Sequence, residues 1–161
     1  VDLIVTTGGV TAGTYDIMKN VLARLGAVEF TRVAISPGMA QGHGYLGPDH
    51  VPIFTLPGSP VSAFVAFEVF VRPVIRRMLG HPQVFRPLIP ARLTHPVAGE
   101  GPLRTYLRGH LHGSAAERLI TPVDELGLVG LRLADSLVVL PEGTGAVPAG
   151  ATVSVMPLGR P

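Results

Sequence analysis

The sequence predicts an α/β domain with a parallel sheet over residues 1–80, followed by a small all-β, barrel-like domain over residues 91–161. Three observations lead to this prediction. In the first half, apolar strand-like runs alternate with loops and helical patterns, which is the order found in parallel α/β sheets. In the second half, short apolar runs alternate with turns. Between the halves, prolines at 82, 87 and 90 indicate a linker over residues 81–90.

The elements of the first half follow from periodicity and loop signals. Residues 1–6 form a continuous apolar run typical of a buried parallel strand, and the glycine-rich residues 7–14 predict a loop. The helix predicted over residues 16–25 ends before Gly26 and has one apolar face, formed by Ile17, Val21, Leu22 and Leu25. Then follow a strand over 29–35, a loop-rich stretch over 36–50, a strand over 51–56 and a long helix over 60–79 that Pro73 should kink.

The second half contains five strand-like runs and no pattern for a long amphipathic helix. The runs cover residues 91–94, 106–111, 119–122, 136–140 and 152–156. His110 and His112 alternate along the second run, which is typical of one face of an exposed strand rather than of a metal-ligand pattern. A domain of about 75 residues lies near the lower size for independent folding.

Composition narrows the class of protein. Hydrophobic residues make up 47% of the chain and charged residues 15%, as in a folded protein with a large core. The net charge is +2, and the arginines are scattered without interleaved aromatics, which argues against a nucleic-acid partner. The absence of cysteine excludes disulfides, thiolate catalysis and zinc–thiolate sites. No run reaches the ~20 apolar residues that a membrane span needs, and no signal peptide is visible.

The beginning of the chain predicts a fragment. There is no initiating Met, and residue 1 already lies within a strand-like run. We therefore expect the sequence to be a piece of a longer polypeptide.

The opening loop, within IVTTGGVTAGTYD, has the features of an anion site. Glycines between a strand and a helix let backbone amides approach a ligand closely, and amides at a helix start favour an anion such as a phosphate. Threonine hydroxyls add further donors. Asp16 stands at the helix start, where it either caps free N–H groups or holds Mg²⁺ beside a phosphate.

A second loop, LPGSPVSAF, has similar features. Ser59 can cap the following helix, and Pro60 suits its first position. The same residues also describe an anion site, with Ser62 one turn into the helix. Both loops should meet at the carboxyl ends of neighbouring parallel strands, where open α/β sheets bind ligands. Within the helix we expect Glu68 to face solvent, with a pair to Arg72 or a place at an interface as alternatives.

Five segments carry a family resemblance when taken together, in this order and at this spacing. They are TTGGVTAGTYD, the pair Pro37 and Gly38, LPGSPVSAFVAFEVFVRPVIRRMLG, YLRG and LVVLPEGTGAVPAGATVSV. Together they resemble the C-terminal half of MoeA-type molybdopterin molybdenumtransferases, the family that includes the gephyrin E domain. The resemblance covers nearly the whole chain.

The resemblance implies a fold, an activity and partners. The fold is a partial three-layer molybdopterin-binding domain, similar to MoaB and Mog proteins, followed by the family's C-terminal β-domain. The first strands of the sheet and two further domains, or a companion chain, are expected ahead of Val1. The implied activity inserts molybdate into adenylylated molybdopterin and releases AMP with Mg²⁺ present, in a cytoplasmic homodimer.

The resemblance also implies roles for individual residues. Catalytic roles fall on Asp16, Ser62 and Arg108, and Asp16 is also the expected Mg²⁺ ligand. Arginine and serine suit a tetrahedral oxyanion such as molybdate because both donate hydrogen bonds and neither repels it. The residues expected to bind the pterin substrate are Thr7, Gly8, Gly9, Thr11, Gly13, Pro37, Gly38, Pro57, Gly58, Ser59 and Pro60.

Departures from the family pattern keep two other functions open. The family often has Lys-Pro-Gly-Lys-Pro, whereas this chain has Ser36 and Met39 in place of the lysines. Ser59 replaces the usual Asn. One alternative is therefore a non-catalytic scaffold or binding module of the same fold. Another is a molybdopterin adenylyltransferase, although the β-domain argues against it because those enzymes usually lack that part.

Overall fold

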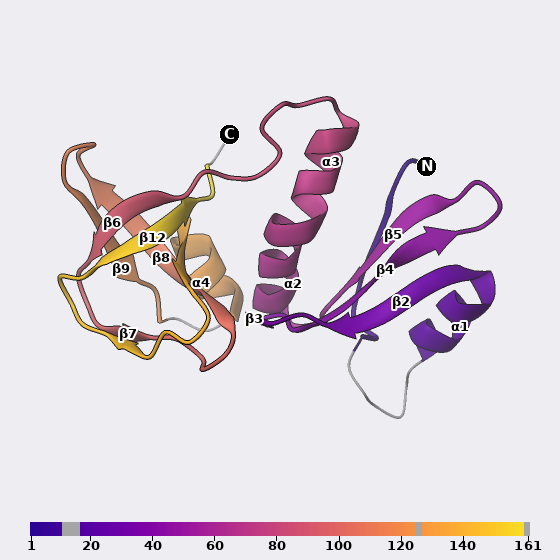
Figure 1. Cartoon of the computed structure of the whole chain (residues 1–161), viewed down its shortest axis with the longest axis horizontal. Helices are drawn as coiled ribbons and strands as arrows, with labels where there is room; N and C mark the ends of the chain where they lie inside the picture. Colours follow the sequence, from indigo (N-terminus) through magenta and orange to yellow (C-terminus); the bar gives the residue numbers. More distant parts are fainter. Residues whose placement is uncertain (11–16, 125–126, 160–161) are drawn as a thin grey trace. The chain divides into compact units, whose positions relative to one another are not determined.

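The computed structural model describes residues 1–10, 17–124 and 127–159. The chain forms two compact units, one made of residues 1–33 and 38–82 and the other of residues 34–37 and 83–161 (Figure 1). The short segment 34–37 thus leaves the first unit and joins the sheet of the second. Within the described part of the chain, every helix is too short or too polar to cross a bilayer.

The first unit contains a four-stranded sheet and two helical regions. Its strands are β1 (Ile4–Thr7), β2 (Gly26–Arg32), β4 (Ala40–Leu46) and β5 (Val51–Leu56), in the order β1-β5-β4-β2. Its helices are α1 (Ile17–Leu25) and a continuous run of α2 (Pro60–Ala66), the π-helical segment η1 (Phe67–Val71) and α3 (Arg72–Met78). The predicted α/β class is confirmed, but only β1 and β5 pair in parallel, and β2, β4 and β5 pair antiparallel.

Strand β4 is the main difference from the predicted elements of this unit. Residues 36–50 were expected to be loop-rich, yet Ala40–Leu46 pairs with β2 on one side and β5 on the other. The strand expected over 29–35 also divides, because β2 ends at Arg32 and β3 (Ile35–Ser36) pairs with β8 in the second unit. Pairing between distant segments, rather than local propensity, makes these strands.

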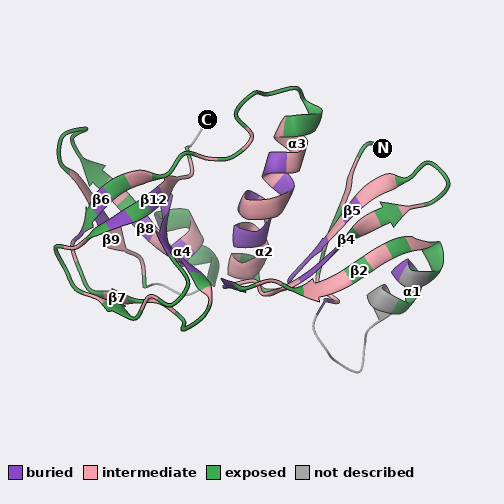
Figure 2. Cartoon of the chain, in the orientation of Figure 1, coloured by how far each residue is buried: buried purple, intermediate pink, exposed green. Residues whose placement is uncertain are grey.

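The helical regions differ in how well they are covered. Phe54 and Leu56 of β5 pack against the α2–α3 run in one apolar cluster, and Ala66 and Val71 are fully buried there (Figure 2). Helix α1 ends at Leu25, as expected. Of its predicted apolar face, Leu22 is buried, whereas Val21 and Leu25 are 42% and 57% exposed. The first unit therefore leaves part of its apolar surface open.

The long helix accommodates Pro73 and Glu68 in ways that the sequence did not indicate. Proline has no N–H for the carbonyl four residues earlier, and a π-helical segment immediately precedes it, in which the Arg72 amide donates to the Phe67 carbonyl. Glu68 was expected to face solvent, but it is only 8% exposed. Its carboxylate lies 3.7 Å from the Arg72 guanidinium one turn away, so the ion-pair alternative is correct.

The second unit is a closed barrel, as predicted. Its long strands are β6 (Ile89–Leu93), β8 (Arg104–Gly113), β9 (Arg118–Pro122), β10 (Ser136–Leu140) and β12 (Thr152–Pro157). The order β10-β12-β6-β9-β8 closes because β8 also pairs with β10, and the short β3 adds to β8. A two-stranded ribbon, β7 (Val97–Ala98) with β11 (Ala146–Val147), and a short helix, α4 (Gly127–Leu133), complete the unit.

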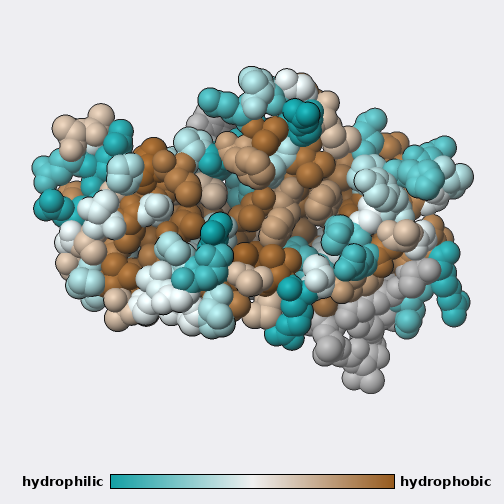
Figure 3. Space-filling model, viewed as in Figure 1, coloured by the Kyte–Doolittle hydropathy of each residue, from teal (hydrophilic) through white to brown (hydrophobic). Residues whose placement is uncertain are grey.

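The barrel core is apolar and buried. Its central side chains are at most 9% exposed and come from four of the strands; they are Ala91, Leu93, Ile120, Val138, Leu140, Val153 and Val155. Figure 3 shows that hydrophobic side chains also reach the visible surface of both units. In the second unit the most exposed of these include Phe85 in the segment before β6 and Leu128 on α4.

Candidate functional site

The carboxyl ends of β1 and β5 bring the two predicted loops together. The strands pair in parallel up to Thr7 and Leu56, and the Gly8 amide then donates to the Leu56 carbonyl at 2.8 Å. A Cβ placed on Gly58 would lie 3.4 Å from the Gly8 Cα, so the two loops approach to about the width of a methyl group. The expected meeting of the loops at the ends of parallel strands is therefore observed.

Glycine is required at the start of the first loop. Gly8 and Gly9 have φ angles of +89° and +71°, which residues with a side chain rarely adopt. Below them, Thr6 and Thr55 face each other in register, and their buried hydroxyl oxygens find no hydrogen-bond partner among the described residues. Thr11, Gly13 and Asp16, which complete the predicted loop, lie outside the described residues.

A cavity of about 590 Å³ opens beside these loops within the first unit. This volume is in the range of small-molecule sites. Its walls come from the ends of β1, β2, β4 and β5 and the start of α2; they are Val10, Phe30, Thr31, Arg32, Gly38, Met39, Ala40, Pro57, Gly58, Ser59 and Ser62. The structure thus brings together five of the predicted site residues: Gly38, Pro57, Gly58, Ser59 and Ser62.

The start of α2 is built differently from the prediction at one position. Pro60 occupies the first turn, as expected. The Ser59 side chain makes no capping hydrogen bond, so the expected cap is wrong. Instead, the Ser59 carbonyl accepts the Ala63 amide at 2.8 Å in the first turn.

Arg32 is a charged residue of the cavity that sequence analysis missed. It is the one charged side chain among the described residues that line the cavity. Its Nε and Nη2 atoms lie 3.1 and 2.8 Å from the Met39 sulfur. Recognising β4 as a strand would have indicated this contact, because β2 and β4 pair Arg32 with Ala40, next to Met39.

Pro37 and Arg108, which were predicted as site residues, and the neighbouring Ser36 belong to the second unit and do not line this cavity. Ser36 is 7% exposed and Pro37 follows it, and both belong to the second unit, where Ser36 pairs with Thr105. Arg108 lies on β8 of that unit, with Nη1 at 3.5 Å from the Gly127 carbonyl. Its catalytic role stays a prediction.

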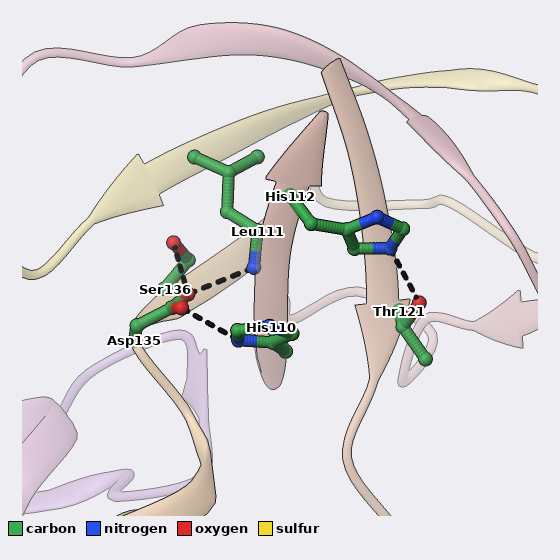
Figure 4. Close-up of polar contacts among 6 residues, drawn as sticks. All are labelled: His110, Leu111, His112, Thr121, Asp135 and Ser136. Carbon is green, nitrogen blue, oxygen red and sulfur yellow. Dashed lines mark hydrogen bonds and ion pairs between the residues drawn. The ribbon is translucent and has the colours of Figure 1, made fainter. Parts of the chain in front are cut away.

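A polar cluster lies on one face of β8 (Figure 4). Asp135 accepts the Leu111 amide at 2.8 Å and the Ser136 hydroxyl at 3.0 Å on one carboxylate oxygen, and its other oxygen lies 2.6 Å from His110 Nδ1. The rings of His110 and His112 stack with centroids 5.8 Å apart. The prediction that the two histidines share an exposed strand face is confirmed.

Two further groups in the second unit have shifted pKa values. Burial raises the pKa of Tyr106 above its ordinary value of 10.0. The pKa of Glu142 is lowered, first by a hydrogen bond from its own backbone amide and further by Arg104, whose Nε lies 3.2 Å away. Both shifts move the groups further from neutral pH.

The described residues contain no group of three or more histidine, aspartate or glutamate side chains that could hold a metal ion. The expected magnesium ligand, Asp16, lies outside them. A magnesium site therefore stays a prediction for the opening loop.

Both parts of the chain match known protein families. Residues 1–77 match the family described as "Probable molybdopterin binding domain", and residues 90–158 match the "MoeA C-terminal region (domain IV)". The chain belongs to the MoeA family. The predicted resemblance is confirmed.

Relatives of this MoeA chain include proteins of known name. It is 38% identical to "Molybdopterin molybdenumtransferase 1" of Mycobacterium tuberculosis H37Rv and 31% identical to "Molybdopterin molybdenumtransferase" of Bacillus subtilis 168. These matches cover 96% and 97% of the chain but only 38% and 37% of the relatives. A molybdopterin biosynthesis MoeA protein from Pyrococcus horikosii aligns with a TM-score of 0.80 and 28% identity, over 99% of this chain and 38% of that one.

Proposed function

We propose that this chain is part of an enzyme that inserts molybdate into adenylylated molybdopterin and releases AMP. The observation that carries the proposal is the cavity where two glycine-containing loops meet, in the unit that matches a molybdopterin-binding domain. The curated relatives are named molybdopterin molybdenumtransferases. Because the chain spans 38% of the mycobacterial relative, we assign the activity to the full-length protein.

Each loop has a proposed part in this reaction. The amides of Gly8, Gly9 and Gly13, with the hydroxyls of Thr7 and Thr11, would hold the phosphate region of the pterin substrate. Asp16 would bind Mg²⁺, which neutralises phosphate charge when bound. Ser62 and Arg108 would bind molybdate as hydrogen-bond donors. The remaining proposed contacts to the pterin substrate come from Pro37, Gly38, Pro57, Gly58, Ser59 and Pro60.

Exposed apolar side chains support the proposal that more protein completes the first unit. Val5 on β1 is 39% exposed, and Val21 and Leu25 on α1 are more exposed still. A cavity of about 710 Å³ between β1 and the end of α3 is lined mainly by apolar residues such as Leu3 and Ile75. We propose that further domains or a companion chain cover this surface, within a homodimer located in the cytoplasm.

The two alternative functions, a molybdopterin adenylyltransferase and a non-catalytic scaffold, can be distinguished from molybdenum insertion. The match of residues 90–158 to the MoeA C-terminal region favours molybdenum insertion over molybdopterin adenylylation. A scaffold of the same fold would bind the pterin substrate without turnover. Measuring AMP release therefore separates the proposal from the scaffold alternative.

The test supplies adenylylated molybdopterin, molybdate and Mg²⁺ and follows AMP release. We expect turnover by the full-length protein and none by the isolated 161-residue chain. Ser62→Ala should slow the full-length protein by up to about tenfold, since one hydrogen bond contributes up to ~1.5 kcal/mol. The matched control is Ser154→Ala on an exposed position of the barrel. Pterin binding by the full-length protein without AMP release would contradict the proposal and support the scaffold.

A further inference from the structure

We propose that Arg32 binds a tetrahedral oxyanion in the cavity, and that the Met39 sulfur holds its guanidinium at the cavity wall until the anion arrives. The oxyanion is either molybdate or a phosphate group of the pterin substrate. The identity of this anion rests on the proposed function, whereas the site itself rests on the contacts below.

The backbone places both side chains at the cavity. Arg32 is the last residue of β2 and pairs with Ala40, the first residue of β4. The Val33 amide donates to the Met39 carbonyl at 2.8 Å, which continues the ladder by one bond. The Gln41 side-chain amide donates to the Gly38 carbonyl at 2.5 Å and fixes the turn into β4. Strand pairing therefore holds Met39 diagonally next to Arg32, one position beyond its partner Ala40.

The guanidinium has a weak partner. Two of its N–H donors point to the Met39 sulfur, and the Arg32 side chain makes no other polar contact among the described residues. A thioether is a weak acceptor, whereas the guanidinium fork matches the paired oxygens of an oxyanion and binds them with charge-assisted hydrogen bonds. An arriving oxyanion would replace the sulfur as partner because it is the stronger acceptor.

The surroundings suit an anion and not a cation. None of the described residues lining the cavity carries a carboxylate, so none of these side chains repels an anion or neutralises Arg32. The hydroxyls of Thr31, Ser59 and Ser62 supply neutral donors on the same walls. Arg32 thereby gives the cavity a positive charge. The chain has Met39 at the position where the family often has a lysine.

The affinity of the protein for anions tests directly whether Arg32 binds an oxyanion. Calorimetry with sodium molybdate and, separately, sodium phosphate is carried out on the full-length protein. Arg32→Gln should weaken binding of at least one anion roughly ten- to a hundredfold, the effect of losing a charge-assisted contact. The matched control is Arg77→Gln, which removes another exposed arginine of the same unit that does not line the cavity. It should leave both affinities unchanged.

Substitution of Met39 tests the partner without removing the arginine. Met39→Glu places a carboxylate beside the guanidinium and should weaken anion binding, because the carboxylate competes with the anion for Arg32 and repels it. Met39→Leu keeps the volume and removes the sulfur, and affinity should stay within about threefold because the thioether contact is weak. The melting temperature of each variant checks that the fold is kept.

The outcomes separate the inference from the proposed function. If Arg32→Gln loses affinity for molybdate alone, Arg32 is assigned to binding of molybdate. If it loses affinity for phosphate alone, Arg32 is assigned to binding of the phosphate group of the pterin substrate. Unchanged affinity for both anions in Arg32→Gln, or no binding of either by the wild type, overturns the inference even if the wild type releases AMP. Arg32-dependent anion binding without AMP release overturns the proposed function alone.

Discussion

The barrel and the α/β unit differ in how completely each covers itself. In the barrel, β10 pairs with both β12 and β8, so the sheet has no open edge there, and its core side chains are at most 9% exposed. In the α/β unit, β1 pairs only with β5 among the described strands, and Val5 remains 39% exposed. The cavity lies in the open unit. The comparison indicates that the candidate site lies in the unit with more exposed apolar surface, while the barrel core is covered by the barrel's own side chains.

The largest expected effect compares two leucines, one in each unit. Leu140→Ala in the barrel core, where the side chain is 2% exposed, should lower the free energy of unfolding by about 2–5 kcal/mol through lost burial and a cavity. Leu79→Ala at the end of α3, where the side chain is 69% exposed, should change it by less than ~0.5 kcal/mol. Urea denaturation followed by circular dichroism, with each transition fitted separately, measures both. These values are expected for the isolated chain; in the full-length protein, a cost at Leu79 similar to that at Leu140 would show that this surface is covered there.

A smaller effect is expected at Asp135, which joins β8 to the start of β10. Asp135→Ala removes the acceptor of the Leu111 amide and the partner of His110. The free energy of unfolding should fall by about 1.5–3 kcal/mol, the range for hydrogen bonds to a charged group. Asp135→Asn should cost less because its amide oxygen can still accept from Leu111. Equal losses in the two variants, measured by the same urea titration, would mean that the charge rather than the backbone contact matters.

The smallest effect on stability is expected in the opening loop of the α/β unit. If Asp16 serves Mg²⁺ or phosphate, Asp16→Asn should weaken binding of the pterin substrate while changing stability by less than ~1 kcal/mol, because Asn is also a good helix cap. Asp16→Ala should reduce stability as well. Calorimetry with the pterin substrate and Mg²⁺ measures the binding. Unchanged affinity in the Asn variant would leave Asp16 with a capping role only.

Much of the fold could be predicted because its signals are local. The strands at 51–56 and 136–140 match β5 and β10 at both ends, and the helix expected over 60–79 ends one residue earlier, at Met78. In these segments, a short apolar run or a proline at the first helical position determines the structure within a few residues. The family could be identified for a similar reason, because its motifs are short and keep their order.

The candidate site could be predicted only in part. Gly58, Ser59 and Ser62 were named as site residues from their loop, and all three line the cavity. Arg32 was missed because its place depends on β4, whose glycines read as a loop. Gly42 sits beneath the Phe30 ring, where a Cβ would come within 2.8 Å of a ring carbon. In this strand glycine therefore makes room for a side chain of the neighbouring strand rather than for a turn.

The sequence by itself determined the class of each half, most strand and helix positions and the family. Only the tertiary structure decided that β4 is a strand, that residues 34–37 join the barrel, that Glu68 is buried against Arg72 and that Arg32 contacts Met39. The physical reason is the same in each case. Local propensity acts over a few residues, whereas strand pairing and burial depend on segments that come together only when the chain folds.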